Sequence, residues 1–354
     1  MKTFLKIILC AGMVSLLTGC GSQSQSPAYS VDTAMGTIIK QTVYTSGDAK
    51  EMMEDIRREI VSLEEDWLSR RKESSAIWQI NDQAGAEEGT ETDRYLWDIL
   101  EKIYQVSEDS QGALDITIGE TVQLWNIDEY AAQSDSAEGG SAQGGSAEDG
   151  MSFRVPDRAD IEATLSRCGY RKVRLEEGWI YLPEGMSLDL GAVGKGVACD
   201  KVLEYLKEQT SVQGAVISIG GSILTYGQKP DGSAWRVGII DPRDTSSYMG
   251  SLVLEDEWCV STSGDYERYV EKDGVRYHHI IDPSTGYPAD AGLISVTVLS
   301  KDGCLSDALS TACFVLGAEK ATALLEEYDA YGVLVEKDGN VILTPGMEKF
   351  YESR

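Results

Sequence analysis

The segment that most constrains the fold of this chain runs from Ser187 to Asp200 and reads SLDLGAVGKGVACD. Two leucines around Asp189 predict a short apolar strand, the glycines predict a tight turn, and the apolar residues that follow recur at helical spacing. Backbone N–H groups in such a turn can approach a phosphate group, and Lys195 would add positive charge. The segment is therefore either a diphosphate site or an ordinary glycine-containing turn. It is not a P-loop, because glycine instead of Ser or Thr follows the lysine.

The pattern of strands and helices along the whole chain indicates an α+β fold. The chain has 354 residues, 42% of them hydrophobic, so it can bury a large core in one or two domains. Strands and helices follow one another without a regular βαβ repeat, which favours mixed or antiparallel sheets with packed helices. Strands are predicted at 37–44, 215–219, 235–240, 251–254 and 293–299, helices at 48–67, 94–107, 305–316 and 319–328, a polar loop at 68–81, and a closing hairpin at 332–344.

Residues 1–19 resemble a bacterial lipoprotein signal peptide. Lys2 and Lys6 precede a short apolar run, and Leu-Thr-Gly leads into Cys20, which would become the lipidated, palmitate-bearing N-terminus. Residues 20–30 are expected to form a flexible tether, and residues 31–350 the folded domain. Within it, a Ser-, Ala- and Gly-rich stretch at 128–150 cannot bury a core and is expected to be a disordered insertion. These features predict a protein anchored by lipid at the extracytoplasmic face of the bacterial cell membrane.

The charge of the chain excludes several classes of function. It has 31 basic and 59 acidic residues, a net charge of −28; removing residues 1–19 takes away two lysines and leaves 29 against 59, or −30. So acidic a protein is not expected to bind nucleic acid or to dock on anionic lipid. An anionic substrate would need a bound cation beside it. The cysteines show no metal-ligand spacing, so a zinc site is not expected.

Two polar clusters in the C-terminal half of the chain carry potential chemistry. His278 and His279 are the only histidines; in a strand only one of two neighbours faces a given site, where it could act as a general acid or base. Asp307 and Thr311 share one face of a predicted helix with Ser310 beside them, and such oxygen ligands suit Mg²⁺. Spacing alone leaves a surface histidine pair and a solvent-facing helix cap open as well.

A series of motifs resembles the FAD:protein FMN transferase family, the ApbE-type flavin transferases, from about residue 31 to residue 344. The most specific motifs are LDLGAVGKG at 188–196 and HIIDPSTGYP at 279–288. The others are Met35-Gly36-Thr37, the serine-containing loop that ends at Asn81, Leu114-Asp115-Ile116-Thr117 with Trp125, ISIGGSI at 217–223 and DALST at 307–311. Their order along the chain, more than any one of them, indicates the resemblance.

The resemblance implies a reaction and a set of site residues. The family binds FAD as a substrate, holds its pyrophosphate with Mg²⁺, and transfers FMN to a Thr or Ser hydroxyl of a target flavoprotein with release of AMP. His279 matches the catalytic histidine. The side chains of Asp307 and Thr311 and the carbonyl of Ala192 match metal ligands, with Ser310 adjacent. The residues that match FAD contacts are Met35, Ala113, Leu114, Asp115, Asp189, Lys195 and Ile281.

The sequence also departs from the family pattern. Arg71 stands where many members have a tyrosine against the flavin, and Ala76 replaces a glutamate. An arginine could stack on the isoalloxazine through a cation–π contact.

Two alternatives to the transferase remain. The same residues would serve a Mg²⁺-dependent FAD pyrophosphatase that gives FMN and AMP, and a lipid-anchored flavin-binding protein without catalysis is the third interpretation. Acceptors of the family carry a Ser/Asp-Gly-Ala-Thr-type motif, which does not occur in this chain. A transferase would therefore act on a separate flavoprotein, either a membrane redox subunit or an extracellular FMN-binding protein.

Overall fold

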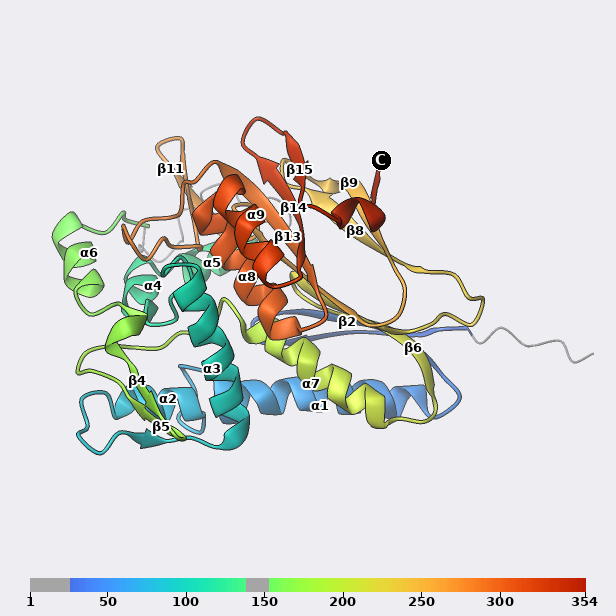
Figure 1. The fold of residues 1–354 in the computed structure, drawn as a ribbon, viewed down its shortest axis with the longest axis horizontal. Helices are drawn as coiled ribbons and strands as arrows, with labels where there is room; N and C mark the ends of the chain where they lie inside the picture. The colour runs from blue at the N-terminus through green and yellow to red at the C-terminus, as the bar shows by residue number, and fades with distance from the viewer. Residues whose placement is uncertain (1–25, 138–152) are drawn as a thin grey trace, which may run out of the picture.

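The computed structural model describes residues 26–137 and 153–354, and the predicted signal peptide, Cys20 and most of the predicted tether lie outside them. An antiparallel sheet with the strand order β1-β2-β6-β7-β10-β13-β14-β15 forms the centre of the molecule (Figure 1). In the pairing of β2 with β6, for example, Ile39 lies opposite Ile219. In the order given, the strands span Ala28–Ala34, Thr37–Thr45, Val212–Ile219, Ser222–Gly227, Trp258–Gly264, Leu293–Ser300, Tyr331–Glu336 and Val341–Leu343.

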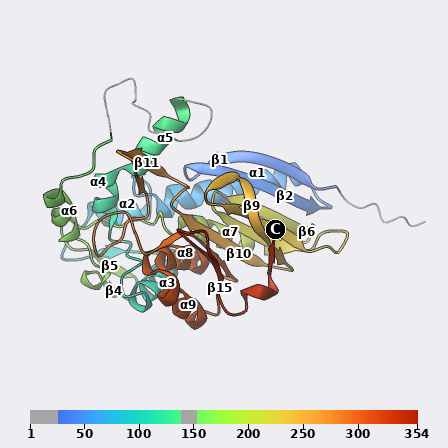
Figure 2. The same ribbon diagram turned by 90° about the horizontal axis from the view of Figure 1, so that it is seen from above.

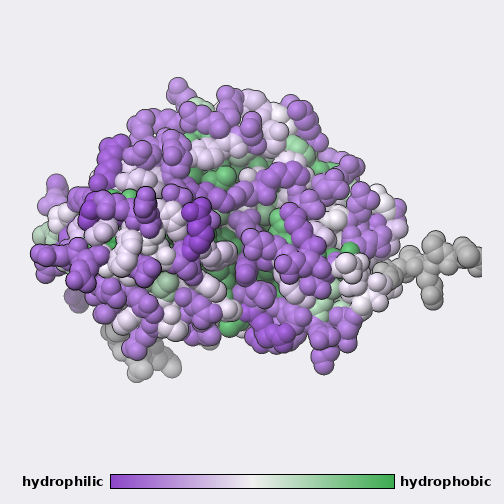
Figure 3. All heavy atoms as spheres, turned by 60° about the horizontal axis from the view of Figure 1, so that its bottom comes forward, coloured by the Kyte–Doolittle hydropathy of each residue, from purple (hydrophilic) through white to green (hydrophobic). Residues whose placement is uncertain are grey.

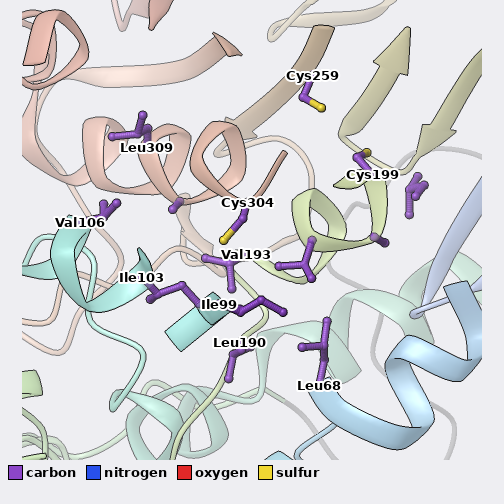
Figure 4. Packing of buried hydrophobic residues seen from close by; sticks show 14 of the residues in the cluster. Leu68, Ile99, Ile103, Val106, Leu190, Val193, Cys199, Cys259, Cys304 and Leu309 are labelled. Atoms are coloured by element: carbon purple, nitrogen blue, oxygen red, sulfur yellow. The ribbon is translucent and has the colours of Figure 1, made fainter. Parts of the chain in front are cut away.

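Helices cover one face of this sheet and build the larger core with it. α8 packs on β10 and β13 and also contacts α3, α7 and α9, while α1 packs on α7. Figure 4 shows the middle of this core, where apolar side chains from α3, α7 and α8 meet. These helices span Ala49–Leu63 (α1), Arg94–Asp109 (α3), Gly194–Glu208 (α7), Gly303–Leu316 (α8) and Ala318–Glu327 (α9).

A smaller sheet covers the opposite face of the large one. It contains β8 (Trp235–Asp241), β9 (Asp244–Leu254) and β16 (Tyr351–Ser353). Because side chains alternate along a strand, Val260 of β10 packs against this sheet while its neighbour Cys259 faces the helices. The large sheet is therefore buried on both faces over its central strands. Its edge strand β1 lies at the margin of the molecule, next to α1 (Figure 2).

Shorter elements surround one end of the large sheet, where the candidate site lies. Figure 1 shows most of them on the side of the molecule away from β8 and β9. They are α2 (Ala76–Asp82), α4 (Gly119–Trp125), α5 (Ile127–Ala137), α6 (Arg158–Leu165), the hairpin of β11 (Tyr269–Lys272) and β12 (Val275–His278), and a small sheet of β3 (Thr90–Glu91), β5 (Trp179–Tyr181) and β4 (Arg174–Glu176).

The surface of the molecule is largely polar. Hydrophilic side chains predominate on the face in Figure 3. None of the helices in the described part of the chain is long and apolar enough to span a membrane.

The structure confirms the α+β class and the predicted hairpin, but it corrects two predicted local structures. Part of the expected loop at 68–81 is the helix α2, because Ile77 and Ile80 recur at helical spacing and are buried. The apolar segment around Asp189 is extended but does not join a sheet. On one side Ser187 forms an isolated parallel bridge with Ile118. On the other side the side chain of Asn81 binds both backbone groups of Leu188, at 2.7 and 3.0 Å, where a second strand would otherwise pair.

Two predicted boundaries also change. β1 begins at Ala28, inside the expected tether, because its residues pair with β2 from Ala28 opposite Val43 onward. The expected insertion at 128–150 is helical in its first part, since α5 extends to Ala137 and Ile127 at its start is buried. Residues 138–150 lie outside the described residues.

Candidate active site

Asp307 lies where α7 and α8 cross. Its Oδ2 accepts a hydrogen bond from the backbone N–H of Gly196 at 2.9 Å, and Lys195 Nζ lies 3.7 Å from Oδ1. The helices approach this closely because both contribute a glycine: a Cβ on Gly196 would lie 2.0 Å from the carbonyl oxygen of Gly303. Asp307 is only 2% exposed, so its charge must be compensated inside the protein. The glycine turn and α8 thus form one polar site.

Hydroxyl groups of α8 and β10 form a small cluster next to the backbone of Asp307. Ser310 Oγ donates to the backbone carbonyl of Asp307 at 2.9 Å and lies 2.8 Å from Ser263 Oγ. Ser263 Oγ is also 3.3 Å from Thr311 Oγ1. Ser310 is buried and its hydroxyl already has two partners, so it acts as a structural neighbour of the site. Thr311 is half-buried, and its hydroxyl is more accessible.

The residues present fit a hard divalent cation. Asp307 Oδ1 has Lys195 at 3.7 Å, too far for a hydrogen bond, so this oxygen retains capacity for another ligand. Thr311 offers a hydroxyl, and the turn that carries the Ala192 carbonyl leads directly into α7. Among the residues described, no cluster of three or more His, Cys, Asp or Glu side chains could hold a metal ion. A cation here would rely on one carboxylate, hydroxyl and carbonyl oxygens, and phosphate oxygens of a substrate, a set that suits Mg²⁺.

Met35 approaches the glycine turn from the tip of the β1–β2 hairpin. Its Cε lies 3.2 Å from where a Cβ of Gly194 would be, and its backbone N–H donates to Glu64 Oε2 at 2.9 Å. Met35 has a φ of 52°, and Gly36 beside it a φ of 64°, so both residues of the turn are left-handed. The hairpin tip thus forms a wall of the site above Lys195 and its turn.

His279 follows β12 and lines a pocket next to this site. Its backbone N–H and its ring Nδ1 both lie against the carbonyl oxygen of Arg268, at 3.1 and 3.2 Å. A carbonyl only accepts hydrogen bonds, so Nδ1 carries the proton and Nε2 keeps its lone pair. The residues that line the pocket are Arg70, Arg71, Val122, Trp125, Asn126, Ile127, Asp128, His279 and Ile281.

The electrostatic surroundings keep His279 neutral near pH 7. Burial lowers the pKa of its imidazole, and the nearby positive charges of Arg268 and Lys195 lower it further. Asp128 acts in the opposite direction and raises this pKa. A neutral ring with a free Nε2 can accept a proton from a hydroxyl group.

His278 points the other way, as expected for neighbouring residues of a strand. Its Nε2 lies 3.0 Å from the carbonyl oxygen of Ala289, its ring packs edge-on against Phe314, and it is 6% exposed. This histidine is part of the core, and only His279 faces the pocket.

Trp125 fixes the loop that follows His279. Its indole Nε1 donates to the carbonyl oxygen of Gly286 at 2.6 Å, and its ring stacks on Tyr277 of β12 with centroids 5.7 Å apart. Gly286 has a φ of 73°, and an added Cβ would lie 2.5 Å from Ile161, so only glycine fits this turn. The motif 279–288 is therefore a rigid hairpin that holds His279 over the pocket.

Comparison with known proteins adds an independent line of evidence. The profile of the ApbE family matches residues 35–335, most of the chain. The chain belongs to the ApbE family. An FAD:protein FMN transferase of Treponema pallidum is 35% identical over 344 residues, covering 91% of this chain and 89% of the relative. One from Klebsiella pneumoniae is 35% identical over 291 residues, covering 81% and 83%.

Solved structures of the ApbE family share the whole fold. The ApbE protein of Thermotoga maritima has a TM-score of 0.79 at 29% identity, covering 93% of this chain and all of its own. The flavin transferase ApbE of Vibrio cholerae has a TM-score of 0.73 at 26% identity, covering 92% and 99%. A histidine-to-glycine variant of the latter protein has also been solved.

The residues that the ApbE resemblance assigns to FAD occupy different environments. Asp189 forms an ion pair with Arg70 at 2.7 Å at the mouth of the glycine turn, and Lys195 pairs with Asp307. Ile281 lines the His279 pocket. Asp115 is 6% exposed and already binds the backbone N–H groups of Thr117 and Tyr170 at 2.9 and 2.8 Å. Its role within the protein is to hold these loops together.

The structure also places the two residues before Asp115 and the two residues that depart from the ApbE pattern. Leu114 is 2% exposed and part of the core, and Ala113 beside it is half-buried. Arg71, in place of the usual tyrosine, is exposed at the His279 pocket. Ala76 begins α2 and packs against the core. The pocket that contains His279 is therefore lined by the positively charged side chain of Arg71.

Sequence reasoning missed three polar residues of the site: Asp128, Arg268 and Ser263. Asp128 falls within the expected disordered insertion because of the composition that follows it. Arg268 acts on His279 through its backbone carbonyl, which no side-chain pattern reveals. Ser263 is two residues from Ser261 on the same strand, and alternation along a strand could have placed both on the helix-facing side.

Proposed function

We propose that this chain is an FAD:protein FMN transferase, the activity that its relatives' names state. The observation that carries the proposal is the arrangement of His279, which lines a pocket, has its Nδ1 engaged by a backbone carbonyl, and lies within the electrostatic influence of Lys195, the partner of Asp307. One part of the site suits a pyrophosphate, and the other can remove a proton from an incoming hydroxyl group.

The chain's own residues account for most steps of the reaction. The acceptor hydroxyl oxygen attacks the phosphorus of the FMN half of FAD, so a phosphoester bond forms and the pyrophosphate bond to AMP breaks. The hydroxyl proton passes to His279 Nε2, and the electron pair of the broken bond leaves with AMP. Lys195 and the N-terminus of α7 place positive charge beside the pyrophosphate.

Mg²⁺ would be held by Asp307, Thr311 and the Ala192 carbonyl. When bound, it supplies neutralisation of the phosphate charge, which phosphoryl transfer needs more than covalent help. The acidity of the whole protein makes this cation more important, because an anionic substrate would otherwise meet a repulsive overall field.

The test uses the protein from Gly21 onward with FAD, Mg²⁺ and an acceptor protein that bears a Ser/Asp-Gly-Ala-Thr-type motif. The acceptor should gain the mass of an FMN phosphoester while AMP appears, and EDTA should abolish both products. His279→Ala should lower the rate at least about 100-fold, as expected for loss of a general base. The adjacent, buried His278→Gln is the matched control and should keep the transfer.

The same experiment separates the alternatives. AMP release without acceptor labelling, in several acceptors of this type, would instead establish an FAD pyrophosphatase, in which water replaces the hydroxyl. FAD binding without either product would leave a flavin-binding protein without catalysis.

We also propose that the protein works outside the cytoplasm, held at the membrane by a lipid on Cys20. The signal-like residues 1–19 support this location. The expected acceptors are then flavoproteins of the same compartment, membrane redox subunits or extracellular FMN-binding proteins.

A further inference from the structure

Asp128 and His279 are brought together by the apolar residues next to them. Ile127 and Ile281 belong to one buried cluster with Trp125, and they are 3% and 7% exposed. Ile127 immediately precedes Asp128, and Ile281 follows His279 by two positions. Packing of this cluster therefore sets the first turn of α5 beside the catalytic histidine, and both Asp128 and His279 line the same pocket.

Arg268 connects the two residues. Its Nη1 lies 3.2 Å from Asp128 Oδ1, and its backbone carbonyl accepts the hydrogen bond from His279 Nδ1. Asp128 Oδ1 is shielded from solvent and accepts no hydrogen bond of good geometry from the described residues. A half-buried carboxylate whose Oδ1 is shielded, next to a histidine that must take up a proton, has a direct electrostatic use.

We propose that Asp128 is a positioning residue for the transfer reaction: its carboxylate stabilises His279 in the protonated state that forms when the acceptor hydroxyl loses its proton. This inference rests on the proposed function of His279. The charges of Arg268, Lys195 and the neighbouring His278 disfavour the imidazolium, and Arg70 and Arg71 line the same pocket. Among the described residues, Asp128 is the nearby charged group that favours it.

The coupling acts on both partners in the expected directions. Burial alone would raise the pKa of the Asp128 carboxyl, but Arg268 and His279 bring it below its ordinary value. Asp128 is therefore ionised at every pH at which the enzyme would work. Burial lowers the pKa of His279, and the Asp128 charge limits that decrease.

The sign of the pH effect follows from this geometry. The reaction needs neutral His279, so the rate falls as pH drops through the pKa of the imidazole. Removing the Asp128 charge lowers that pKa, which moves the acidic limb of the kcat profile to lower pH. The plateau rate should also fall about 10-fold, because a weaker base takes up the proton less readily. A variant that only destabilised the protein would not shift the acidic limb of the kcat profile.

The experiment compares Asp128→Asn with Glu129→Gln in the complete reaction of enzyme, FAD, Mg²⁺ and acceptor. Glu129 is the next residue of the same helix, carries the same charge and is exposed, so it is a matched control. Asp128→Glu, which keeps the carboxylate, should restore most of the rate. Equal kcat profiles for Asp128→Asn and Glu129→Gln would overturn the proposal.

A second measurement does not depend on acceptor transfer. Because the chain has only two histidines, an NMR titration that follows the imidazole Cε1–H groups gives two resonances, and His279→Gln assigns them. The His279 resonance should titrate at lower pH in Asp128→Asn than in the unsubstituted protein, with His278 unchanged. An unchanged His279 titration would overturn the coupling, whereas a shift without flavin transfer in the native enzyme would count against the proposed function alone.

Discussion

Two buried serine pairs at the α8–β10 contact differ in one respect that matters for the site. Ser261 Oγ lies 2.8 Å from Ser306 Oγ, and two residues further along β10, Ser263 Oγ lies 2.8 Å from Ser310 Oγ. Only the second pair reaches a predicted metal ligand, since Ser263 is also 3.3 Å from Thr311 Oγ1. The first pair continues to Ser222 instead. Ser261 therefore serves as a matched control for the effect of the Ser263 hydroxyl on Thr311.

Ser263→Ala should weaken Mg²⁺ binding about 10-fold, because a group that orients a metal ligand is worth roughly that much. Ser261→Ala should leave Mg²⁺ binding unchanged, although each substitution should cost about 1 kcal/mol of stability through the lost hydrogen bond. Calorimetric titration with Mg²⁺ in the presence of FAD measures the first effect, and urea unfolding the second. Equal Mg²⁺ affinities in both variants would show that Ser263 has no role beyond packing.

At the residue scale, the sequence could identify groups whose type is rare but not those that act through position. His279 was predictable because the chain has only two histidines, and adjacent residues of a strand face opposite sides, so only one of them can face the site. Asp128 was not, because aspartate is common in this acidic chain and the composition after it suggests disorder. Its significance comes from Ile127 and Ile281, which pack together although they are far apart in sequence.

At the element scale, the crossing of α7 and α8 depends on glycine in both helices. A Cβ on Gly196 would lie 2.0 Å from the backbone oxygen of Gly303, and one on Gly303 would lie 2.3 Å from the backbone oxygen of Gly196. Backbone atoms cannot move aside as a side chain does. The Gly196 N–H bond to Asp307 depends on this short separation.

Gly196→Ala should therefore destabilise the protein by about 3 kcal/mol, the upper part of the range for overpacking in a core. Gly194→Ala, in the same helix, should change stability by less than about 1 kcal/mol, since its Cβ would meet only side-chain ends, Met35 Cε at 3.2 Å and Leu68 Cδ1 at 3.7 Å. Urea unfolding followed by circular dichroism compares the two. Similar unfolding midpoints for both variants would contradict a glycine-dependent crossing.

Most elements were predictable from hydrophobic periodicity, and the exceptions have local causes. α2 was missed because its seven residues sit within a polar stretch and only Ile77 and Ile80 mark the buried side. The apolar segment before the glycine turn satisfies strand patterning, yet Asn81 takes the hydrogen bonds of Leu188 that a neighbouring strand would have made. A side chain that bonds the backbone in this way leaves no periodic pattern in the sequence by which it could be predicted.

At the scale of the whole molecule, the proposed location of the protein would depend on Cys20, which lies outside the described residues. Cys20→Ser should move the protein from the membrane fraction, where detergent is needed to extract it, to the soluble fraction. Cys10→Ser is the matched control, because that cysteine lies within the predicted signal peptide, and it should leave the protein with the membrane. Fractionation of cells followed by immunoblotting measures both. Membrane retention of Cys20→Ser would rule out lipid anchoring through that residue.

The early start of β1 limits how far an anchored enzyme can reach. The eight residue-to-residue steps from Cys20 to Ala28 extend at most about 28 Å, and the seven residues of β1 add about 24 Å before Met35 at the site. With a lipid on Cys20, Met35 at the site would work within about 50 Å of the bilayer. Height above the membrane then becomes a criterion of substrate selection. Two acceptors with the same motif would be modified at different rates when their threonines stand at different heights.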